Sequence, residues 1–398
     1  MTYSILSTSD MHAQYPNIVL DLKQLHPDLL IDNGDFLIGN LFSLFCYLNY
    51  SISPLTHLAN SIQYDVMIPG NHDLDYGLDW LIQQVQVLKA DYICANLYDP
   101  QGKRIFQPYM LKETRDGTRI LVIGLMTSAF SRLTRPEVIS QCIVKSAVES
   151  LRVIIDDITE SELKYDHLCL AYHGGIVQDP VNGQYWHYPS EEDQAYQLMD
   201  QFPEIDNLIC GHQHLVKEAV HSNGVAMVQV GSHGKYYGEQ TFDRGRLLTN
   251  QVHKAESLMR ENCLLKPIYE GAYQEWLQIS VDQEDFMKYL VATYPADLVY
   301  MDLGKDKTLR GLSKQLVLPF PIQQYVIEGW RLIDCILKNE ETHPMQRVSQ
   351  PIDQIEEDKV YTVIATDSLL PNYRIREKIL TPVLEDYVLA RRDHFKRI

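Results

Sequence analysis

The chain has 398 residues, of which 45% are hydrophobic and 22% are charged, and its formal net charge at pH 7 is -18. This length exceeds the roughly 250 to 300 residues that one hydrophobic core usually holds, so we expect two domains. Contacts with nucleic-acid phosphates need an excess of Lys and Arg, so the negative charge argues against a polymeric nucleic acid as partner. A small phosphorylated substrate held through bound cations is compatible with it.

Seven cysteines without a Cys-x-x-Cys pair predict neither a disulfide framework nor a thiolate zinc site. Reduced, mostly buried cysteines are typical of a cytosolic protein. Met1 leads straight into a strand-like run without a signal-peptide pattern. The most apolar stretch, residues 36–48, is shorter than the roughly 20 residues that span a bilayer. We therefore expect a cytoplasmic protein without a membrane segment, in which residues 36–48 form a core helix.

Short apolar runs recur along the N-terminal part of the chain, with helix-like segments between several of them. These predicted strands cover residues 3–6, 29–31, 65–68, 120–123, 167–172, 207–210 and 225–230. Their continuous apolar character is typical of strands that are covered on both faces. The alternation of strands and helices predicts an α/β fold.

Five of these predicted strands are followed by polar side chains, usually beside a glycine. The clusters are Asp10-Met11-His12, Asn33-Gly34-Asp35, Gly70-Asn71-His72-Asp73, His173-Gly174-Gly175 and Gly211-His212-Gln213-His214. The carboxyl ends of strands line the ligand crevice of open α/β sheets, so we expect the five clusters to converge. Taken singly, each has a structural explanation, because Asp caps helices and His, Asn and Gly are common in turns.

A converged site would offer nitrogen and oxygen donors from Asp10, His12, Asp35, Asn71, His173, His212 and His214. Mixed donors without a thiolate suit zinc, manganese, iron or cobalt. The set is too large for one open catalytic ion and fits two divalent ions that share a carboxylate. Two ions roughly 3.5 to 4 Å apart can hold a deprotonated water and clamp phosphoryl oxygens, which predicts hydrolysis of a phosphate ester.

His72 lies outside this donor set. We expect it to stabilise the charge that develops on the phosphoryl oxygens or to protonate the leaving group. Asp75, three residues later, would fix the tautomer and the orientation of the His72 ring.

The five clusters in this order, with Asp75 and the later Gly231-Ser232-His233-Gly234, resemble the calcineurin-like metallophosphoesterase superfamily and, within it, the 5′-nucleotidase and UDP-sugar hydrolase branch. The resemblance covers about residues 1–250 and implies a four-layer α/β/β/α sandwich and the His72–Asp75 dyad. It implies one ion held by Asp10, His12, Asp35 and His214. It implies a second ion held by Asp35, Asn71, His173 and His212, with Asp35 bridging the two.

We expect the domains to be a catalytic domain over residues 1–250, a linker over 251–265 and a smaller α+β domain over 266–398. The periodicity within the last domain predicts helices over residues 283–294 and 325–337 and a strand over residues 360–365.

This last domain resembles the substrate domain of the 5′-nucleotidase branch, with two departures. The Gly-Gly-x-Arg loop, whose arginine holds phosphate in relatives, is replaced by residues 303–307, with Arg310 further on. The Gly-Gly-Asp-Gly-Tyr segment that presents a base-stacking aromatic is replaced by residues 370–374. Lys cannot reproduce the two-pronged hold of Arg on phosphate. The candidate substrate contacts are Lys305, Lys307, Arg310 and Tyr373; the alternative is that they are ordinary surface or core side chains.

These observations favour a metal-dependent phosphoesterase that acts on a nucleotide or a related small metabolite, in the manner of a 5′-nucleotidase. Two alternatives stay open. One is a phosphodiesterase acting on a cyclic nucleotide or a nucleotide sugar. The other is a non-enzymatic module that binds metal or nucleotide, and the His72–Asp75 pair argues against it because binding alone does not need that pair.

Overall fold

The structure is a computed structural model of the chain. It describes residues 2–14, 22, 24–130, 136–186, 191–255, 267–294, 296–315, 322–339, 346–366, 369–370, 375–378 and 383–396. The chain divides into two compact units, residues 1–266 and residues 267–398.

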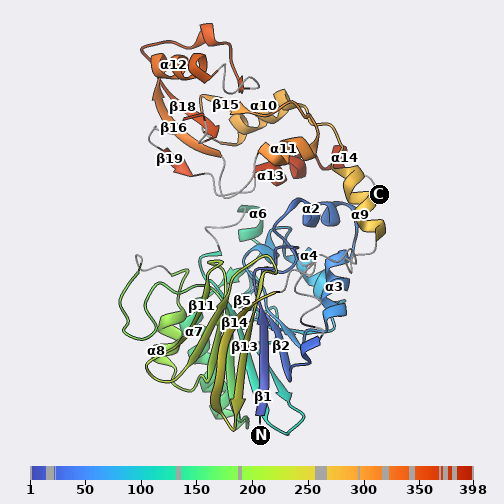
Figure 1. Cartoon of the computed structure of the whole chain (residues 1–398), viewed down its shortest axis with the longest axis vertical. Helices are drawn as coiled ribbons and strands as arrows, with labels where there is room; N and C mark the ends of the chain where they lie inside the picture. The colour runs from blue at the N-terminus through green and yellow to red at the C-terminus, as the bar shows by residue number, and fades with distance from the viewer. Residues whose placement is uncertain are drawn as a thin grey trace. The chain divides into compact units, whose positions relative to one another are not determined.

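The first unit is built on two six-stranded sheets (Figure 1). One sheet has the order β14 (Arg246–Lys254), β13 (Tyr236–Asp243), β1 (Thr2–Thr8), β2 (Leu29–Asp32), β3 (Val66–Met67) and β4 (Asp91–Tyr92). The other has the order β11 (Val216–Val220), β12 (Ala226–Val230), β10 (Asn207–Cys210), β9 (His167–His173), β7 (Arg119–Met126) and β6 (Tyr109–Glu113). Strands β1 to β4 are parallel to one another, and so are β7, β9, β10 and β12. A further short pair joins β5 (Leu97–Tyr98) to β8 (Ile143–Val144).

The strands of the second sheet are buried on both faces because successive side chains point to opposite sides. In β7, Ile120 and Val122 pack between the two sheets, whereas Leu121 and Ile123 face the helix layer. That layer consists of α7 (Ala147–Glu160) and α8 (Ala195–Gln201), which share a core with the outer face of the sheet. This explains why the strand sequences are continuously apolar.

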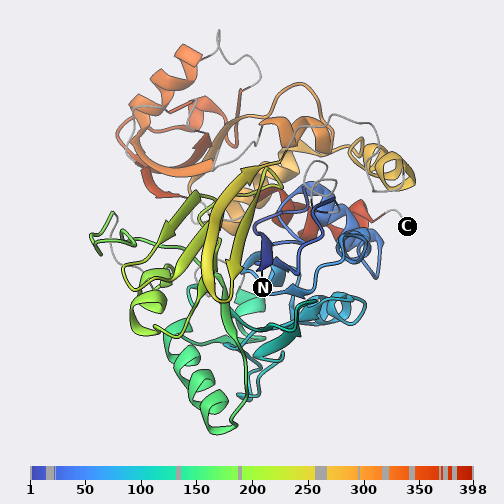
Figure 2. The same cartoon turned by 60° about the horizontal axis from the view of Figure 1, so that its bottom comes forward.

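The remaining helices of the first unit are α2 (Leu41–Asn49), α3 (Pro54–Ile62), α4 (Leu78–Val85), α6 (Pro136–Ile139) and the short 3-10 helix η1 (His72–Leu74). Helices α3 and α4 lie on the side of the first sheet that faces away from the second, as Figures 1 and 2 show from two directions. The layers therefore follow the order α/β/β/α, and the predicted four-layer sandwich is confirmed.

All seven predicted strands are present, each within three residues of its predicted bounds. The core helix predicted over residues 36–48 is wrong at its start, since α2 begins only at Leu41. Asn40 caps this helix, and its side chain accepts hydrogen bonds from the backbone amides of Phe42 and Ser43. The residues before it form a buried loop, in which the amide of Leu37 donates to Asp73. Because this loop is buried, its residues are as apolar as those of the helix, and composition alone could not show where the helix begins.

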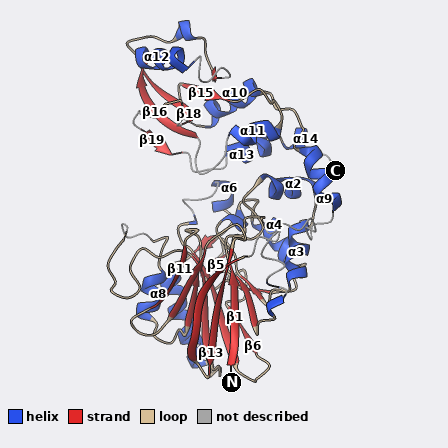
Figure 3. Cartoon of the chain, in the orientation of Figure 1, coloured by secondary structure: helices blue, strands red, loops and turns tan. Residues whose placement is uncertain are grey.

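The second unit contains a five-stranded sheet with helices beside it, which confirms the predicted α+β architecture (Figure 3). The strand order is β17 (Gln346–Val348), β15 (Leu298–Asp302), β18 (Val360–Thr366), β16 (Ile322–Glu328) and β19 (Ile375–Lys378). The helices are α9 (Pro267–Trp276), α10 (Gln283–Thr293), α11 (Leu309–Gln315), α12 (Gly329–Asn339), η2 (Ile352–Gln354), α13 (Val383–Ala390) and α14 (Arg392–Phe395).

Two of the three elements predicted in this unit are confirmed, as α10 and β18. The helix predicted over residues 325–337 is wrong in its first residues, because β16 continues to Glu328 and α12 begins at Gly329. Tyr325 pairs with Val363 across the sheet. An apolar run of this length is compatible with a strand or a helix, and here pairing with β18 makes its first part a strand. Among the described residues, no helix is long and apolar enough to cross a membrane.

Candidate metal centre

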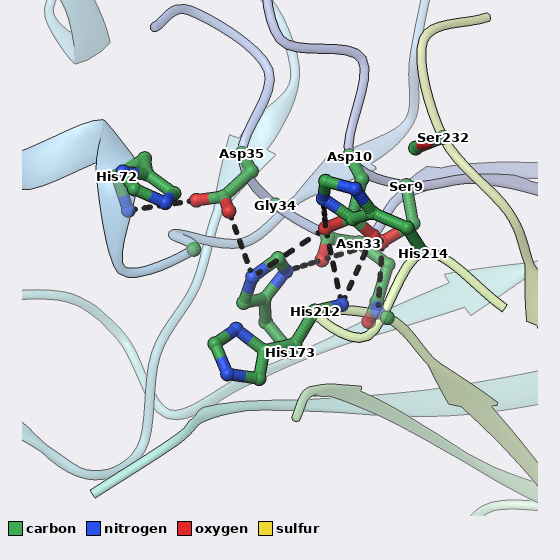
Figure 4. A network of polar contacts seen from close by, with 12 residues as sticks. Ser9, Asp10, Asn33, Gly34, Asp35, His72, His173, His212, His214 and Ser232 are labelled. Atoms are coloured by element: carbon green, nitrogen blue, oxygen red, sulfur yellow. Dashed lines mark hydrogen bonds and ion pairs between the residues drawn. The ribbon is translucent and has the colours of Figure 1, made fainter. Parts of the chain in front are cut away.

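The polar clusters follow β1, β2, β3, β9 and β10, and the loops at these strand ends bring candidate ligands together in one place (Figure 4). Two groups have ligand atoms that lie within 4.8 Å of one another: Asp10, His12 and His214, and Asp10, Asp35 and His173. Asp10 belongs to both groups. Asp35 also faces both, since its Oδ2 lies 3.1 Å from His173 Nε2 and 3.9 Å from His12 Nε2. The two carboxylates are therefore shared between His173 and the pair formed by His12 and His214.

Backbone carbonyls orient two of the imidazoles. Nδ1 of His12 lies 3.0 Å from the carbonyl of Ile38, and Nδ1 of His173 lies 2.7 Å from the carbonyl of Asn33. Because a carbonyl can only accept, each Nδ1 carries a proton, and in the neutral ring that a metal requires the lone pair is on Nε2. Both Nε2 atoms face the carboxylates, which is how histidines that bind metals are commonly held.

The donors fit divalent cations because most of them are buried and, within the described part of the chain, face one another or no partner at all. Among the described residues, Oδ1 of Asn71 is buried and has no hydrogen-bond partner, and the buried Nε2 of His173 faces only the carboxylates of Asp35 and Asp10. A buried polar atom left without a partner costs about 1 to 3 kcal/mol. Nε2 of His12 also lies 2.9 Å from Nε2 of His214. A cation close to these atoms would satisfy all of them.

The backbone at these positions is strained. Asp10, His12, Asp35, His212 and His214 have φ angles of 53°, 45°, 56°, 72° and 58°. A non-glycine residue seldom adopts this left-handed region, and such residues concentrate at functional sites. Strained backbone at five residues that follow strand ends indicates a functional site, because strain lowers stability and persists where function requires it.

Asp73 organises the loops that carry Asp35 and Asn71. Its carboxylate accepts hydrogen bonds from the backbone amides of Asp35 at 2.8 Å, Leu37 at 3.0 Å and Gly70 at 3.0 Å. Burial, and then the nearby charge of Asp35, raise the pKa of Asp73 to about 6. No role was predicted for Asp73 from the sequence, because nothing in its local pattern shows three amides converging on it.

The structure also brings together His72 and Asp75. Nδ1 of His72 lies 2.8 Å from Oδ2 of Asp75, and the amide of His72 donates to Oδ1 of Asp35 at 2.8 Å. The His72 ring centroid lies 5.5 Å from that of His12. The His72 side chain is 37% exposed, so an incoming ligand can reach it.

The buried charges of the site control one another. Burial alone would raise the pKa values of Asp10 and Asp35, but the neighbouring His173 is the largest opposing influence and both pKa values fall below the ordinary range. Burial alone would lower the pKa of His173, and the charges of Asp35 and Asp10 raise it to about 9. In the metal-free protein a protonated His173 therefore compensates the two carboxylates.

His212 is placed differently from the other imidazoles. Its amide donates to both carboxylate oxygens of Asp10, at 3.1 and 3.0 Å, and its Nε2 lies 2.5 Å from Oε1 of Glu192. The backbone carbonyl of Glu192 accepts hydrogen bonds from the hydroxyls of Thr127 and Tyr172. Glu192 was not predicted from the sequence, because it stands twenty residues before His212 and shares no motif with it.

The candidate substrate contacts belong to the second unit. Lys305 and Lys307 are exposed in the loop after β15. Arg310, in the first turn of α11, donates through its guanidinium to the side chain of Gln274 in α9. Tyr373 lies outside the described residues. In the second unit, Arg310 therefore links two helices.

The sequence matches known proteins over most of its length. It is 28% identical over 323 residues to a 2′,3′-cyclic-nucleotide 2′-phosphodiesterase/3′-nucleotidase of Yersinia enterocolitica, which covers 71% of this chain and 45% of that protein. It is 29% identical over 245 residues to a 5′-nucleotidase of Vibrio cholerae, covering 57% of this chain and 43% of that protein. The chain thus spans less than half the length of these relatives.

Solved structures share the fold. A NAD nucleotidase of Haemophilus influenzae superposes with a TM-score of 0.64 at 14% identity, covering 99% of this chain and 98% of that one. A 5′-nucleotidase precursor of Thermus thermophilus gives a TM-score of 0.58 at 14% identity, covering 100% and 96%.

The model of the family described as calcineurin-like phosphoesterase matches residues 3–216, which contain all five polar clusters. The resemblance expected from those clusters is confirmed: the chain belongs to the calcineurin-like phosphoesterase family.

Proposed function

We propose that this protein is a metal-dependent hydrolase that cleaves a phosphate ester of a nucleotide or a related small metabolite. The observation that carries the proposal is the pair of Asp/His groups that share Asp10, supported by the buried Oδ1 of Asn71, which has no hydrogen-bond partner among the described residues. The names of the relatives, 5′-nucleotidase and cyclic-nucleotide phosphodiesterase/3′-nucleotidase, support the substrate class.

Two divalent ions, which could be manganese, zinc, iron or cobalt, would be held by these side chains. One would take Asp10, His12, Asp35 and His214; the other would take Asp35, Asn71, His173 and His212. Bound there, the ions would neutralise phosphate charge and activate water. Asn71 supports this assignment because its Oδ1 is buried, lacks a hydrogen-bond partner among the described residues and can act as a neutral ligand.

The chain's own contribution to the chemistry would come from His72. Asp75 holds its Nδ1, so Nε2 is the nitrogen that would donate a proton or a hydrogen bond. The amide of His72 donates to Asp35, which ties the position of the ring to a candidate metal ligand. We assign His72 to the oxygen of the phosphoryl or leaving group, and Asp75 to positioning His72.

The domain roles follow from the same reasoning. Residues 1–250 would form the catalytic domain, residues 251–265 the linker and residues 266–398 a divergent substrate domain. The strand β14 belongs with the first unit and continues to Lys254. Lys305, Lys307, Arg310 and Tyr373 are the substrate contacts proposed for the last domain.

We also propose a cytoplasmic location. Six free cysteines lie among the described residues, and five of them are buried. Unpaired thiols are typical of proteins in a reducing compartment.

A second function is favoured by one observation. The match to the cyclic-nucleotide phosphodiesterase/3′-nucleotidase covers more of this chain than the match to the 5′-nucleotidase. A diesterase acting on 2′,3′-cyclic nucleotides is therefore the alternative.

A panel of esters separates the two. Manganese-loaded protein would be incubated with 5′-AMP, 3′-AMP, 2′,3′-cyclic AMP and bis-(p-nitrophenyl) phosphate. Phosphate release from 5′-AMP or 3′-AMP without cleavage of the cyclic or bis ester supports the nucleotidase, and cleavage of the cyclic or bis ester supports the diesterase. The protein carrying Asp35→Asn should lose the activity. Asp200→Asn, an exposed substitution of the same kind on α8, should keep it. No hydrolysis of any ester by the unmodified protein would contradict the proposal.

A further inference from the structure

His233 is an additional imidazole beside the candidate metal centre. It lies on the loop between β12 and β13, and two backbone hydrogen bonds fix this loop. The amide of Gly231 donates to the carbonyl of Leu215 at 2.8 Å, and the amide of His233 donates to the carbonyl of Asp10 at 2.7 Å. The second bond joins the loop directly to a candidate ligand residue.

The His233 ring faces two of the candidate ligands. Its centroid lies 5.4 Å from that of His12 and 5.4 Å from that of His214. His12 also contacts the ring of His72, at 5.5 Å. The ring of His12 therefore contacts two imidazoles that are not candidate metal ligands, those of His72 and His233.

The backbone of His233 is in a strained conformation. Its φ angle is 60°, in the left-handed region that non-glycine residues seldom adopt. Its Nδ1 lies 2.7 Å from the hydroxyl of Ser232 (labelled in Figure 4). One ring nitrogen is thus used within the loop, and Nε2 is the one left to contact a ligand.

The geometry distinguishes His233 from a metal ligand and from a core residue. The groups whose ligand atoms lie within 4.8 Å of one another, among the described residues, include His12 and His214 but not His233. The residue is also only half-buried, so its ring borders space that solvent or a ligand can enter.

We propose that His233 is a substrate-contact residue, which donates a hydrogen bond from Nε2 to an oxygen of a phosphate group bound on the Asp10–His12–His214 side of the centre. When the hydroxyl of Ser232 donates to Nδ1, the ring proton resides on Nε2, as this role requires. The inference rests on the proposed function and adds a second imidazole donor to that of His72. The ligand class is a phosphate monoanion or dianion, free or esterified.

Calorimetry with inorganic phosphate tests the inference without relying on turnover. The probe is phosphate titrated into the manganese-loaded protein, with manganese content measured on the same samples. In His233→Phe the phosphate Kd should rise about tenfold, the loss expected for one hydrogen bond to a charged group, with manganese content unchanged. His233→Gln, whose amide can place an N–H near Nε2, should recover much of that loss. Asp200→Asn should bind phosphate like the unmodified protein.

Kinetics on the ester that the protein hydrolyses give a second readout. His233→Phe should raise KM about tenfold while kcat changes by less than about threefold, since the contact serves binding. The inference is overturned if His233→Phe and His233→Gln both bind phosphate as tightly as the unmodified protein, or if either loses manganese. If the unmodified protein binds phosphate but hydrolyses no ester, the proposed function fails while the effect of His233→Phe on the phosphate Kd still decides this inference.

Discussion

Glu192 holds the imidazole of His212, with Oε1 of the carboxylate 2.5 Å from Nε2 of the ring. Glu192 is itself fixed through its backbone carbonyl by the hydroxyls of Thr127 and Tyr172. If His212 holds a metal as proposed, Nδ1 would be the nitrogen that binds it, and Glu192 would act as the carboxylate partner that metal-binding histidines commonly have.

Removing this carboxylate should weaken metal binding without unfolding the protein. We expect Glu192→Gln to reduce manganese affinity about 10- to 100-fold, because His212 loses the partner that orients it. Competition with a fluorescent chelator measures the affinity. Glu191→Gln, an exposed neighbour, is the matched control and should bind manganese normally. Equal affinities in all three proteins would show that Glu192 does not support the site.

Asp73 should matter for stability rather than for ligand contact. Asp73→Ala leaves the buried amides of Asp35, Leu37 and Gly70 without their acceptor. Since each unsatisfied group costs about 1 to 3 kcal/mol, we expect the free energy of unfolding to fall by about 3 kcal/mol or more. Urea denaturation of metal-free protein measures it, with Asp200→Asn as control. A loss below about 1 kcal/mol would mean that water replaces the carboxylate.

Gly70 leaves room for Asp35. A Cβ atom at position 70 would lie 2.1 Å from Oδ1 of Asp35 and 2.5 Å from its amide nitrogen. Gly70→Ala should therefore displace the carboxylate and abolish metal binding, as measured by manganese content after gel filtration. Gly271→Ala is the control, because a Cβ there meets no atom within 4 Å and alanine is favoured within a helix such as α9. Normal manganese content in Gly70→Ala would contradict the close packing of these loops.

The metal-free protein should lose stability as the pH rises from 6.5 to about 9. Burial alone would lower the pKa of His173, but the charges of Asp35 and Asp10 outweigh burial and raise this pKa from 6.5 to about 9. Over this interval the folded chain keeps a proton that the unfolded chain has released. The stabilisation is complete below pH 6.5 and disappears as the pH approaches 9.

Thermal unfolding of EDTA-treated protein at a series of pH values measures this dependence. His173→Asn removes the titrating ring and should flatten the profile over the same interval. A midpoint that rises between pH 6.5 and 9 in the unmodified protein would show that other groups dominate.

The ends of the strands were the most predictable feature of this chain. An apolar run indicates a strand, and the polar cluster directly after it indicates where the strand stops. The predicted strands are present, and the loops that follow the carboxyl ends of five of them bring candidate ligands together. Residues 36–40 could not be separated from α2, and β16 could not be separated from α12, because burial makes loops, strands and helices equally apolar. The family resemblance supplied the layer order, which no local pattern contains.

Contacts between site residues that are far apart in the chain could not be predicted from the sequence. Glu192 reaches His212 across 20 positions, and His233 reaches His12 across more than two hundred. Neither distance along the chain is a recognisable spacing. Only the folded loops bring these side chains together, so the support of the centre had to be found in the structure.

The most direct test of the account is phosphate release from nucleotide esters by EDTA-treated protein, before and after manganese is restored. We predict no release without metal, recovery with manganese, and no recovery in Asp35→Asn, while Asp200→Asn recovers like the unmodified protein. Hydrolysis that survives metal removal, or that persists undiminished in Asp35→Asn, would contradict the claim that the Asp/His centre carries the reaction.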